Sequence, residues 1–164
     1  MNRLDRMIAR LTTQRACLTA ALTVITDITG PVLEIGFGKG RTYDFLRHAA
    51  PTRDIYAFDH DGAPHTDWGP DEDHFFAGDF RKAFARVPAR TGALAALAHC
   101  DIGSEDGVRD TELADWMAGA LPALMASGSV VVSDRALAIA GARPLELPAD
   151  AADFPYFMVR LDSR

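Results

Sequence analysis

Three glycines at regular spacing follow a short segment of the sequence that is apolar apart from one acid. Residues 32–35 are apolar except for Glu34, and glycines stand at positions 36, 38 and 40. Glycine lets the backbone approach a ligand closely and adopt dihedral angles closed to other residues. A helix expected over 41–50 would begin directly after them, and a helix N-terminus offers free N–H groups and the positive end of the helix dipole. The arrangement predicts a binding site for a charged small molecule.

Two classes of ligand compete for this glycine-rich loop. The dinucleotide fingerprint is G-x-G-x-x-G, but its last position, counted from Gly36, is Arg41 rather than glycine. The pattern E-x-G-x-G-x-G, from Glu34 to Gly40, resembles motif I of the class I methyltransferases that use S-adenosylmethionine (SAM). A glycine-rich turn without a ligand is the remaining interpretation.

The resemblance implies that this loop wraps the methionine and ribose parts of SAM. SAM carries no pyrophosphate, so a strongly anion-selective turn is not required, and an acid beside the loop suits a cationic ligand. The implied cofactor contacts from this part of the chain are Glu34, Gly36, Phe37, Gly38 and Gly40.

An acid also ends the second expected strand, over residues 54–59. Asp59 lies 19 residues beyond Gly40, and an acid at that strand end can accept both hydroxyls of a ribose. The resemblance implies this role toward SAM, with His60 lining the adenine side. The alternative is a loop carboxylate that caps the next turn.

The third expected strand, over residues 74–79, ends in another acid. Gly78, Asp79 and Phe80 resemble the adenine-binding corner of the family, in which the aspartate accepts from the exocyclic amine of the purine. The alternative is that Asp79 caps a helix expected over 80–86.

The segment 60–73 between these strands is rich in turn-forming residues, where the family usually has a helix. We expect a loop there. Trp68 within it would either stack on the adenine or a substrate, or plug the edge of the core.

The apolar run at 94–100 is typical of a central parallel strand covered on both faces, and it ends at Asp101. This places Asp101 beside the expected reactive end of SAM, as the catalytic candidate or as a holder of the cofactor's amino group. Methyl transfer from a sulfonium mostly needs alignment and exclusion of water, with a base only when the acceptor must lose a proton. Asp134, His60 and His99 are the other candidates by position, although His99 fits a satisfied core histidine better.

The remaining elements supply the scaffold for these strand ends. We expect a helix over 3–29 that packs on the sheet, with a lid over the cofactor or a dimer face as the alternative, and a second long helix over 110–126. Strands are expected over 129–133, 144–147 and 156–161, and the resemblance implies an antiparallel hairpin at the sheet edge. The stripe of the first helix comprises Leu4, Met7, Ile8, Leu11, Leu18, Leu22 and Ile25.

These patterns predict one α/β domain over residues 1–164, with an N-terminal helical segment (1–29) and an α/β core (30–164). The core is a doubly wound, Rossmann-like, mostly parallel sheet of about seven strands with helices on both faces.

The composition narrows the classes of partner and compartment. The chain has 164 residues, 48% of them hydrophobic, and a net charge of -6, which disfavours a nucleic-acid partner. Cys17 and Cys100 lie far apart, so they suggest neither a metal site nor a disulfide framework and fit a reducing compartment. Without an apolar signal-peptide region or a span long enough for a bilayer, we expect a cytoplasmic protein with no membrane partner.

The function we predict is methyl transfer from SAM to an unidentified small molecule, and a homo-oligomer is compatible with the sequence. A non-catalytic module that binds SAM or a nucleoside is the first alternative. A nicotinamide-dependent enzyme is the second, and the position of Arg41 disfavours it.

Overall fold

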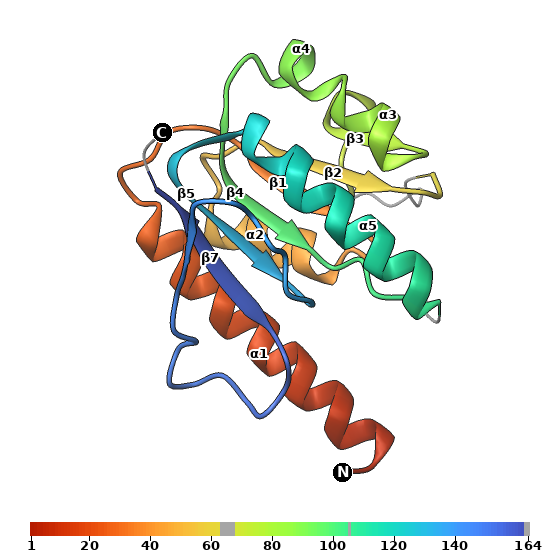
Figure 1. Cartoon of the computed structure of the whole chain (residues 1–164), viewed down its shortest axis with the longest axis vertical. Coiled ribbons are helices and arrows are strands. Elements are labelled where there is room, and N and C mark those ends of the chain that lie inside the picture. The colour runs from red at the N-terminus through yellow and green to blue at the C-terminus, as the bar shows by residue number, and fades with distance from the viewer. Residues whose placement is uncertain (63–67, 105, 163–164) are drawn as a thin grey trace.

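The computed structural model describes residues 1–62, 68–104 and 106–162. Within them, seven strands form one sheet in the order β3-β2-β1-β4-β5-β7-β6 (Figure 1). Strands β1 to β5 run parallel, and β7 runs antiparallel to both of its neighbours. The strands are β1 Val32–Ile35, β2 Ile55–Asp59, β3 Phe75–Ala77, β4 Ala95–Cys100, β5 Met125–Ser133, β6 Ala142–Pro144 and β7 Phe157–Leu161.

Helices cover both faces of this sheet (Figure 1), which confirms the predicted doubly wound architecture. Helices α1 and α2 pack on one face, while α3, α4 and α5 lie on the other. Successive residues of a strand point to opposite faces, so Val32 joins the core beneath α1 and Leu33 the core beneath α5. The helices are α1 Arg3–Val24, α2 Arg41–Ala49, α3 Phe80–Phe84, α4 Val87–Thr91 and α5 Gly107–Ala120, with 3-10 turns at Glu72–His74 and Leu121–Ala123.

The central strand β4 is buried along its whole length, as its continuous apolar run predicted. Its register on β1 sets Glu34 beside His99, so two polar side chains meet inside an otherwise apolar layer. A buried polar group costs free energy unless it is hydrogen-bonded, and these two groups bond to each other.

Helix α1 differs from its prediction in length and in what it buries. It ends at Val24 rather than 29, and it runs without a break through Thr13, whose hydroxyl donates to the carbonyl of Ala152. Only its second half lies against the sheet, with Leu18 fully buried. Its first half extends beyond the carboxyl ends of the strands (Figure 1), so Leu4, at 68% exposure, contradicts the predicted continuous buried stripe.

Helix α5 begins three residues before the predicted start because Asp106 caps it, accepting from the backbone N–H of Arg109. It ends at Ala120 instead of 126, since Pro122 cannot continue the helix and a 3-10 turn follows. Strand β5 therefore begins at Met125, four residues earlier than predicted.

The short connections differ by smaller amounts. The predicted helix over 80–86 ends at Phe84 as α3, and a second short helix, α4, follows it. Strand β6 begins at Ala142 rather than 144, and the antiparallel edge hairpin with β7 is confirmed. Between β2 and β3, the described residues hold a 3-10 turn and no α-helix, while residues 63–67 of the predicted loop lie outside the described residues. None of the described helices is both long and apolar enough to cross a membrane.

Candidate functional site

A cavity of about 380 Å³ lies at the carboxyl edge of the sheet, where the strand order reverses direction. The chain leaves β1 toward α2 on one face and leaves β4 toward α5 on the other. The loops after these adjacent strands therefore diverge, and a crevice opens between them. The first half of α1 forms a further wall, through Met7, Arg10, Leu11 and Gln14.

Most of the predicted site residues meet in this cavity. Seven of them line it: Gly36, Phe37, Gly38, Asp59, His60, Phe80 and Asp101. Gly78 and Asp79 line a smaller hollow of about 100 Å³, together with His60 and Phe80. Glu34 and Gly40 belong to the lining of neither hollow.

The glycine-rich loop is shaped by contacts that leave no room for side chains. Gly36 has a φ of 92°, and a Cβ there would collide with the backbone carbonyl of Asp101, so this loop and the loop after β4 touch. At Gly40, a Cβ would collide with the ring of Trp68. Gly40 begins α2 without a side-chain cap, which leaves the first N–H groups of that helix to other partners.

Trp68 lies on the outer side of this loop. Its ring stacks on Phe37, with centroids 6.3 Å apart and an interplanar angle of 18°, and it remains 45% exposed. The residues that line the cavity do not include it. Trp68 was predicted either to stack on a ligand or to plug the edge of the core, and the structure has it at the edge of the core.

Asp59 holds the tip of the glycine-rich loop from the end of β2. Its carboxylate accepts from the backbone N–H of Gly38 at 2.7 Å and from that of Asp61 at 3.2 Å. The carboxylate thus caps the turn, as the alternative interpretation predicted, and it also lines the cavity. His60 follows it with a largely exposed side chain.

Asp79 caps α3 by accepting from the N–H groups of Arg81 at 2.8 Å and Lys82 at 3.3 Å. One Asp79 oxygen accepts both bonds, so the other remains for a further donor. The corner formed by Gly78, Asp79 and Phe80 lies beside His60, near the end of β2.

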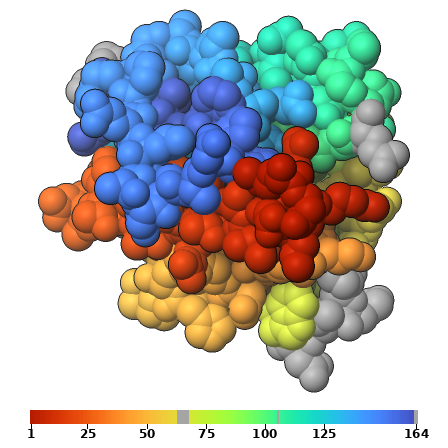
Figure 2. All heavy atoms as spheres, turned by 90° about the horizontal axis from the view of Figure 1, so that it is seen from below, coloured from red at the N-terminus to blue at the C-terminus, as the bar shows by residue number. Residues whose placement is uncertain are grey.

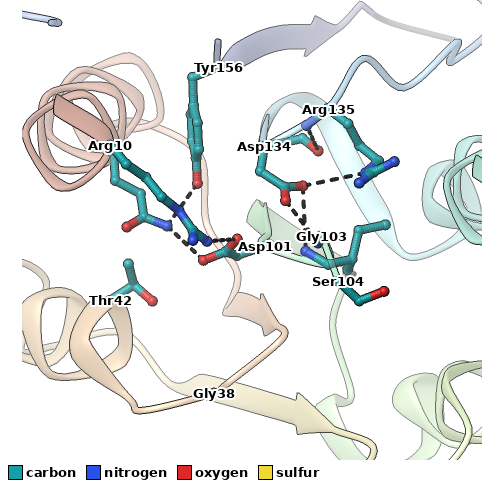
Figure 3. A network of polar contacts seen from close by, with 12 residues as sticks. Arg10, Gly38, Thr42, Asp101, Gly103, Ser104, Asp134, Arg135 and Tyr156 are labelled. Atoms are coloured by element: carbon teal, nitrogen blue, oxygen red, sulfur yellow. Dashed lines mark hydrogen bonds and ion pairs between the residues drawn. The ribbon is translucent and has the colours of Figure 1, made fainter. Parts of the chain in front are cut away.

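Asp101 is held by two side chains of α1, which the sequence analysis did not connect to it. Its Oδ1 lies 2.5 Å from a guanidinium nitrogen of Arg10 (Figure 3). Its Oδ2 accepts from Gln14 Nε2 at 2.8 Å. Gln14 donates in addition to the hydroxyl of Tyr156 at 3.1 Å. The cavity floor therefore carries an ion pair, since Arg10 and Asp101 both line it.

Behind Asp101, Glu34 and His99 form a fully buried pair. His99 Nδ1 lies 2.8 Å from Glu34 Oε2, and its Nε2 lies 2.6 Å from the Tyr156 hydroxyl. The other oxygen of Glu34 accepts from the hydroxyl of Thr42. Burial by itself lowers the pKa of His99, but the Glu34 carboxylate outweighs it, and the pKa is raised above its ordinary value. His99 is the satisfied core histidine that the sequence favoured, and Glu34 faces the core instead of the cavity.

Asp134, another sequence candidate, braces the loop after β4. It accepts from the N–H group of Gly103 at 2.8 Å (Figure 3) and from that of Ile102 at 3.4 Å. Burial and the nearby Asp101 carboxylate raise its pKa, while the Gly103 N–H and Arg135 oppose the shift. Asp134 lies outside the lining of the cavity.

Comparison with known proteins shows to which family the chain belongs. The family described as S-adenosyl-L-methionine methyltransferase matches residues 1–161. The chain belongs to this family. It is therefore a SAM-dependent methyltransferase, as the pattern from Glu34 to Gly40 predicted.

Solved structures agree with this assignment. An S-adenosyl-L-methionine methyltransferase from Silicibacter pomeroyi DSS-3 is 34% identical, with a TM-score of 0.88 over 98% of this chain and 99% of that one. A structure described as a putative caffeoyl-CoA O-methyltransferase from Staphylococcus aureus is 10% identical, with a TM-score of 0.52 over 99% and 85% of the two chains, and shares the fold. No protein with a curated description matches the sequence.

The cavity of this methyltransferase is rich in basic side chains, although the protein has a net charge of -6. Arg10, Lys39, Arg41 and Arg109 all line it. Among the described residues, Arg10 is the one member of this set that forms an ion pair. The set brings positive charge to the wall of the cavity.

Proposed function

We propose that the cavity binds SAM across the end of β1, with its adenosine toward Asp59 and its amino-acid end toward Asp101, for methyl transfer to a small molecule. One observation carries the proposal: carboxylates follow or end β2 and β4, the two neighbours of β1, and both line one cavity. Adjacent strands lie about 4.8 Å apart, so two strand spacings separate these positions by roughly 10 Å. A nucleoside joined to an amino acid spans such a distance.

The adenosine part finds suitable partners near the end of β2. The Asp59 carboxylate accepts two backbone N–H bonds, and a carboxylate has about four acceptor positions, so it can also accept from ribose hydroxyls. Phe80 and the free oxygen of Asp79 are placed for the ring and the exocyclic amine of adenine.

The amino-acid part is complementary to the ion pair on the cavity floor. An α-amino acid carries an ammonium and a carboxylate side by side, as Asp101 and Arg10 carry the opposite charges side by side. The ammonium would bind Asp101, whose oxygens each retain a lone pair, and the carboxylate would bind Arg10 or another basic side chain of the cavity.

The chemical work of these residues is alignment and electrostatics. When bound, SAM supplies a methyl group on a sulfonium, an activated leaving group. Asp101 accepts from Arg10 and Gln14, which hold its carboxylate in one orientation toward the cofactor. If the acceptor must lose a proton, His60 is the histidine among the residues that line the cavity, and we propose it as the base.

We infer that the methyl acceptor is a small molecule, because Met7, Arg10 and Leu11 of α1 form one wall of the cavity.

Calorimetry tests the proposed function with SAM, S-adenosylhomocysteine and NAD as ligands. We expect both sulfur ligands to bind at least tenfold more tightly than NAD. Tighter binding of NAD would contradict the proposal.

A further inference from the structure

A chain of buried polar side chains runs from Asp101 into the core of the protein. Gln14 Nε2 lies 2.8 Å from Asp101 and 3.1 Å from the Tyr156 hydroxyl, and His99 joins that hydroxyl to Glu34. Gln14 and Tyr156 are each 3% exposed, and the two residues behind them are fully buried. At the cavity end, Asp101 and Gln14 are both part of the lining.

The donors in this chain determine how Gln14 is turned. An amide nitrogen can only donate, so Gln14 gives one N–H to Asp101 and the other to the oxygen of Tyr156. With the amide turned over, its oxygen would oppose the Asp101 carboxylate, and two acceptors would face each other in a buried place. The Asp101 carboxylate therefore fixes which side of the Gln14 amide faces it, and the Tyr156 oxygen anchors the same nitrogen by accepting its second N–H.

Tyr156 is itself held from behind. Its hydroxyl lies 2.6 Å from His99 Nε2, and His99 Nδ1 lies 2.8 Å from Glu34, which also accepts from Thr42. Each member is thus fixed by the next, back to strand β1. Apolar side chains could fill the same core positions without the desolvation cost of polar groups. The chain of bonds ends at Asp101, a carboxylate that lines the cavity, which points to a role at that end.

We propose that Gln14 and Tyr156 are positioning residues, which hold the Asp101 carboxylate for the ammonium group of the cofactor. The proposal rests on the contact between Asp101 and the cofactor given above. Arg10 and Gln14 stand four residues apart, so they are neighbours on one face of α1, and both reach Asp101. The first half of α1, which lies on the surface beside the C-terminal segment (red and blue in Figure 2), is thereby part of the cofactor site.

Two ligands separate positioning of Asp101 from general support of the fold. S-adenosylhomocysteine carries the amino-acid end, whereas 5′-methylthioadenosine has the same adenosine thioether without it. Calorimetry on Gln14→Leu and Tyr156→Phe measures the affinity of each ligand. We expect each variant to bind S-adenosylhomocysteine about tenfold more weakly, the scale of one lost hydrogen bond to a charged group, and methylthioadenosine within twofold of the wild type.

Matched variants control for helix docking and for loss of a tyrosine hydroxyl. Thr13→Val removes the bond from α1 to the Ala152 carbonyl, next to Gln14 but away from Asp101. Tyr56→Phe removes a hydroxyl near Arg90, at the other side of the sheet. Both should leave the ratio of the two affinities unchanged. Thermal unfolding verifies that each variant folds, and if Gln14→Leu does not, Tyr156→Phe, which loses a single oxygen, decides the question.

The outcomes distinguish this inference from the proposed function. Equal weakening of both ligands, or no change in either, in the Gln14 and Tyr156 variants would overturn the positioning role. Asp101→Asn, measured in parallel, should lower the affinity for S-adenosylhomocysteine alone. If its affinity ratio is unchanged, the Asp101 contact fails and the inference with it. If that ratio falls while the Gln14 and Tyr156 ratios stay constant, only the inference fails.

Discussion

Glu34 and His99 stand opposite each other on β1 and β4, and their side chains meet at 2.8 Å with no exposure to solvent. The parallel register places them side by side, so the acid of the glycine-rich motif is committed to the core. A buried carboxylate without this partner would carry a large desolvation cost. The pair makes the stability of the protein depend on pH.

The first prediction concerns that dependence. The pKa of His99 is raised in the folded protein, with Glu34, Asp101 and Asp134 all favouring the charged imidazole against the effect of burial. The stabilisation is therefore fully present below the ordinary pKa of about 6.5 and is lost as pH rises through the raised pKa of the folded state. In urea unfolding, the stability difference between wild type and His99→Gln should shrink from pH 6 to pH 9. If the stability difference between the two proteins is constant from pH 6 to pH 9, the predicted contribution of charged His99 is wrong.

Asp59 provides the second prediction. Asp59→Ala should weaken binding of S-adenosylhomocysteine by about 1–3 kcal/mol, because a charged acceptor for the ribose is lost. The fold should persist, since Asp59 lies at a strand end. Asp61→Ala is the control, because Asp61 interacts with Asp59 through its backbone N–H, which this change retains. Calorimetry measures both variants, and unchanged affinity in Asp59→Ala would place the ribose elsewhere.

The third prediction tests the contact between the loops that flank the cavity. Gly36→Ala should lower the free energy of unfolding by about 2–4 kcal/mol, since the new Cβ would meet the Asp101 carbonyl at a φ of 92°. Gly119→Ala, on an exposed turn of α5 with nothing within 4 Å, should instead add about 0.5–1 kcal/mol. Denaturant unfolding compares the two, and equal effects would argue against the predicted collision.

Trp68 gives the fourth prediction. Because its ring packs on Phe37 and Gly40 outside the cavity, Trp68→Ala should cost about 1–2 kcal/mol of stability while leaving the affinity for S-adenosylhomocysteine within twofold. Thermal unfolding and calorimetry on one sample give both quantities. A large loss of affinity at unchanged stability would mean that Trp68 stacks on the ligand.

The fold could be predicted because its signals are local. The apolar run that became β4 and the acids at strand ends are visible in single segments, and the parallel sheet follows from their order. The ends of helices were harder to predict. The cap by Asp106 and the break at Pro122 shifted both ends of α5 from their predicted positions. The apolar stripe of α1 indicated a helix but not how far the sheet beneath it extends.

The residues of the site that lie at the ends of strands were predicted from the sequence. Asp59 and Asp101 line the cavity, as expected, but Arg10, Gln14 and Tyr156 were missed. Gln14 is 87 residues from Asp101 and 142 from Tyr156, so their contacts depend on how α1 and the last strand pack on the sheet. The single local signal was a polar residue, Gln14, near the apolar stripe of a helix.

A crystal structure with S-adenosylhomocysteine would show where the cofactor lies and which way it points. We expect the ligand in the cavity between the loops after β1 and β4, with its ribose hydroxyls bonded to Asp59 and its ammonium within about 3.2 Å of an Asp101 oxygen. Arg10 and Gln14 should remain beside that carboxylate. A ligand bound in the opposite direction, with its amino-acid end at Asp59, or bound outside this cavity, would contradict the proposed binding of SAM.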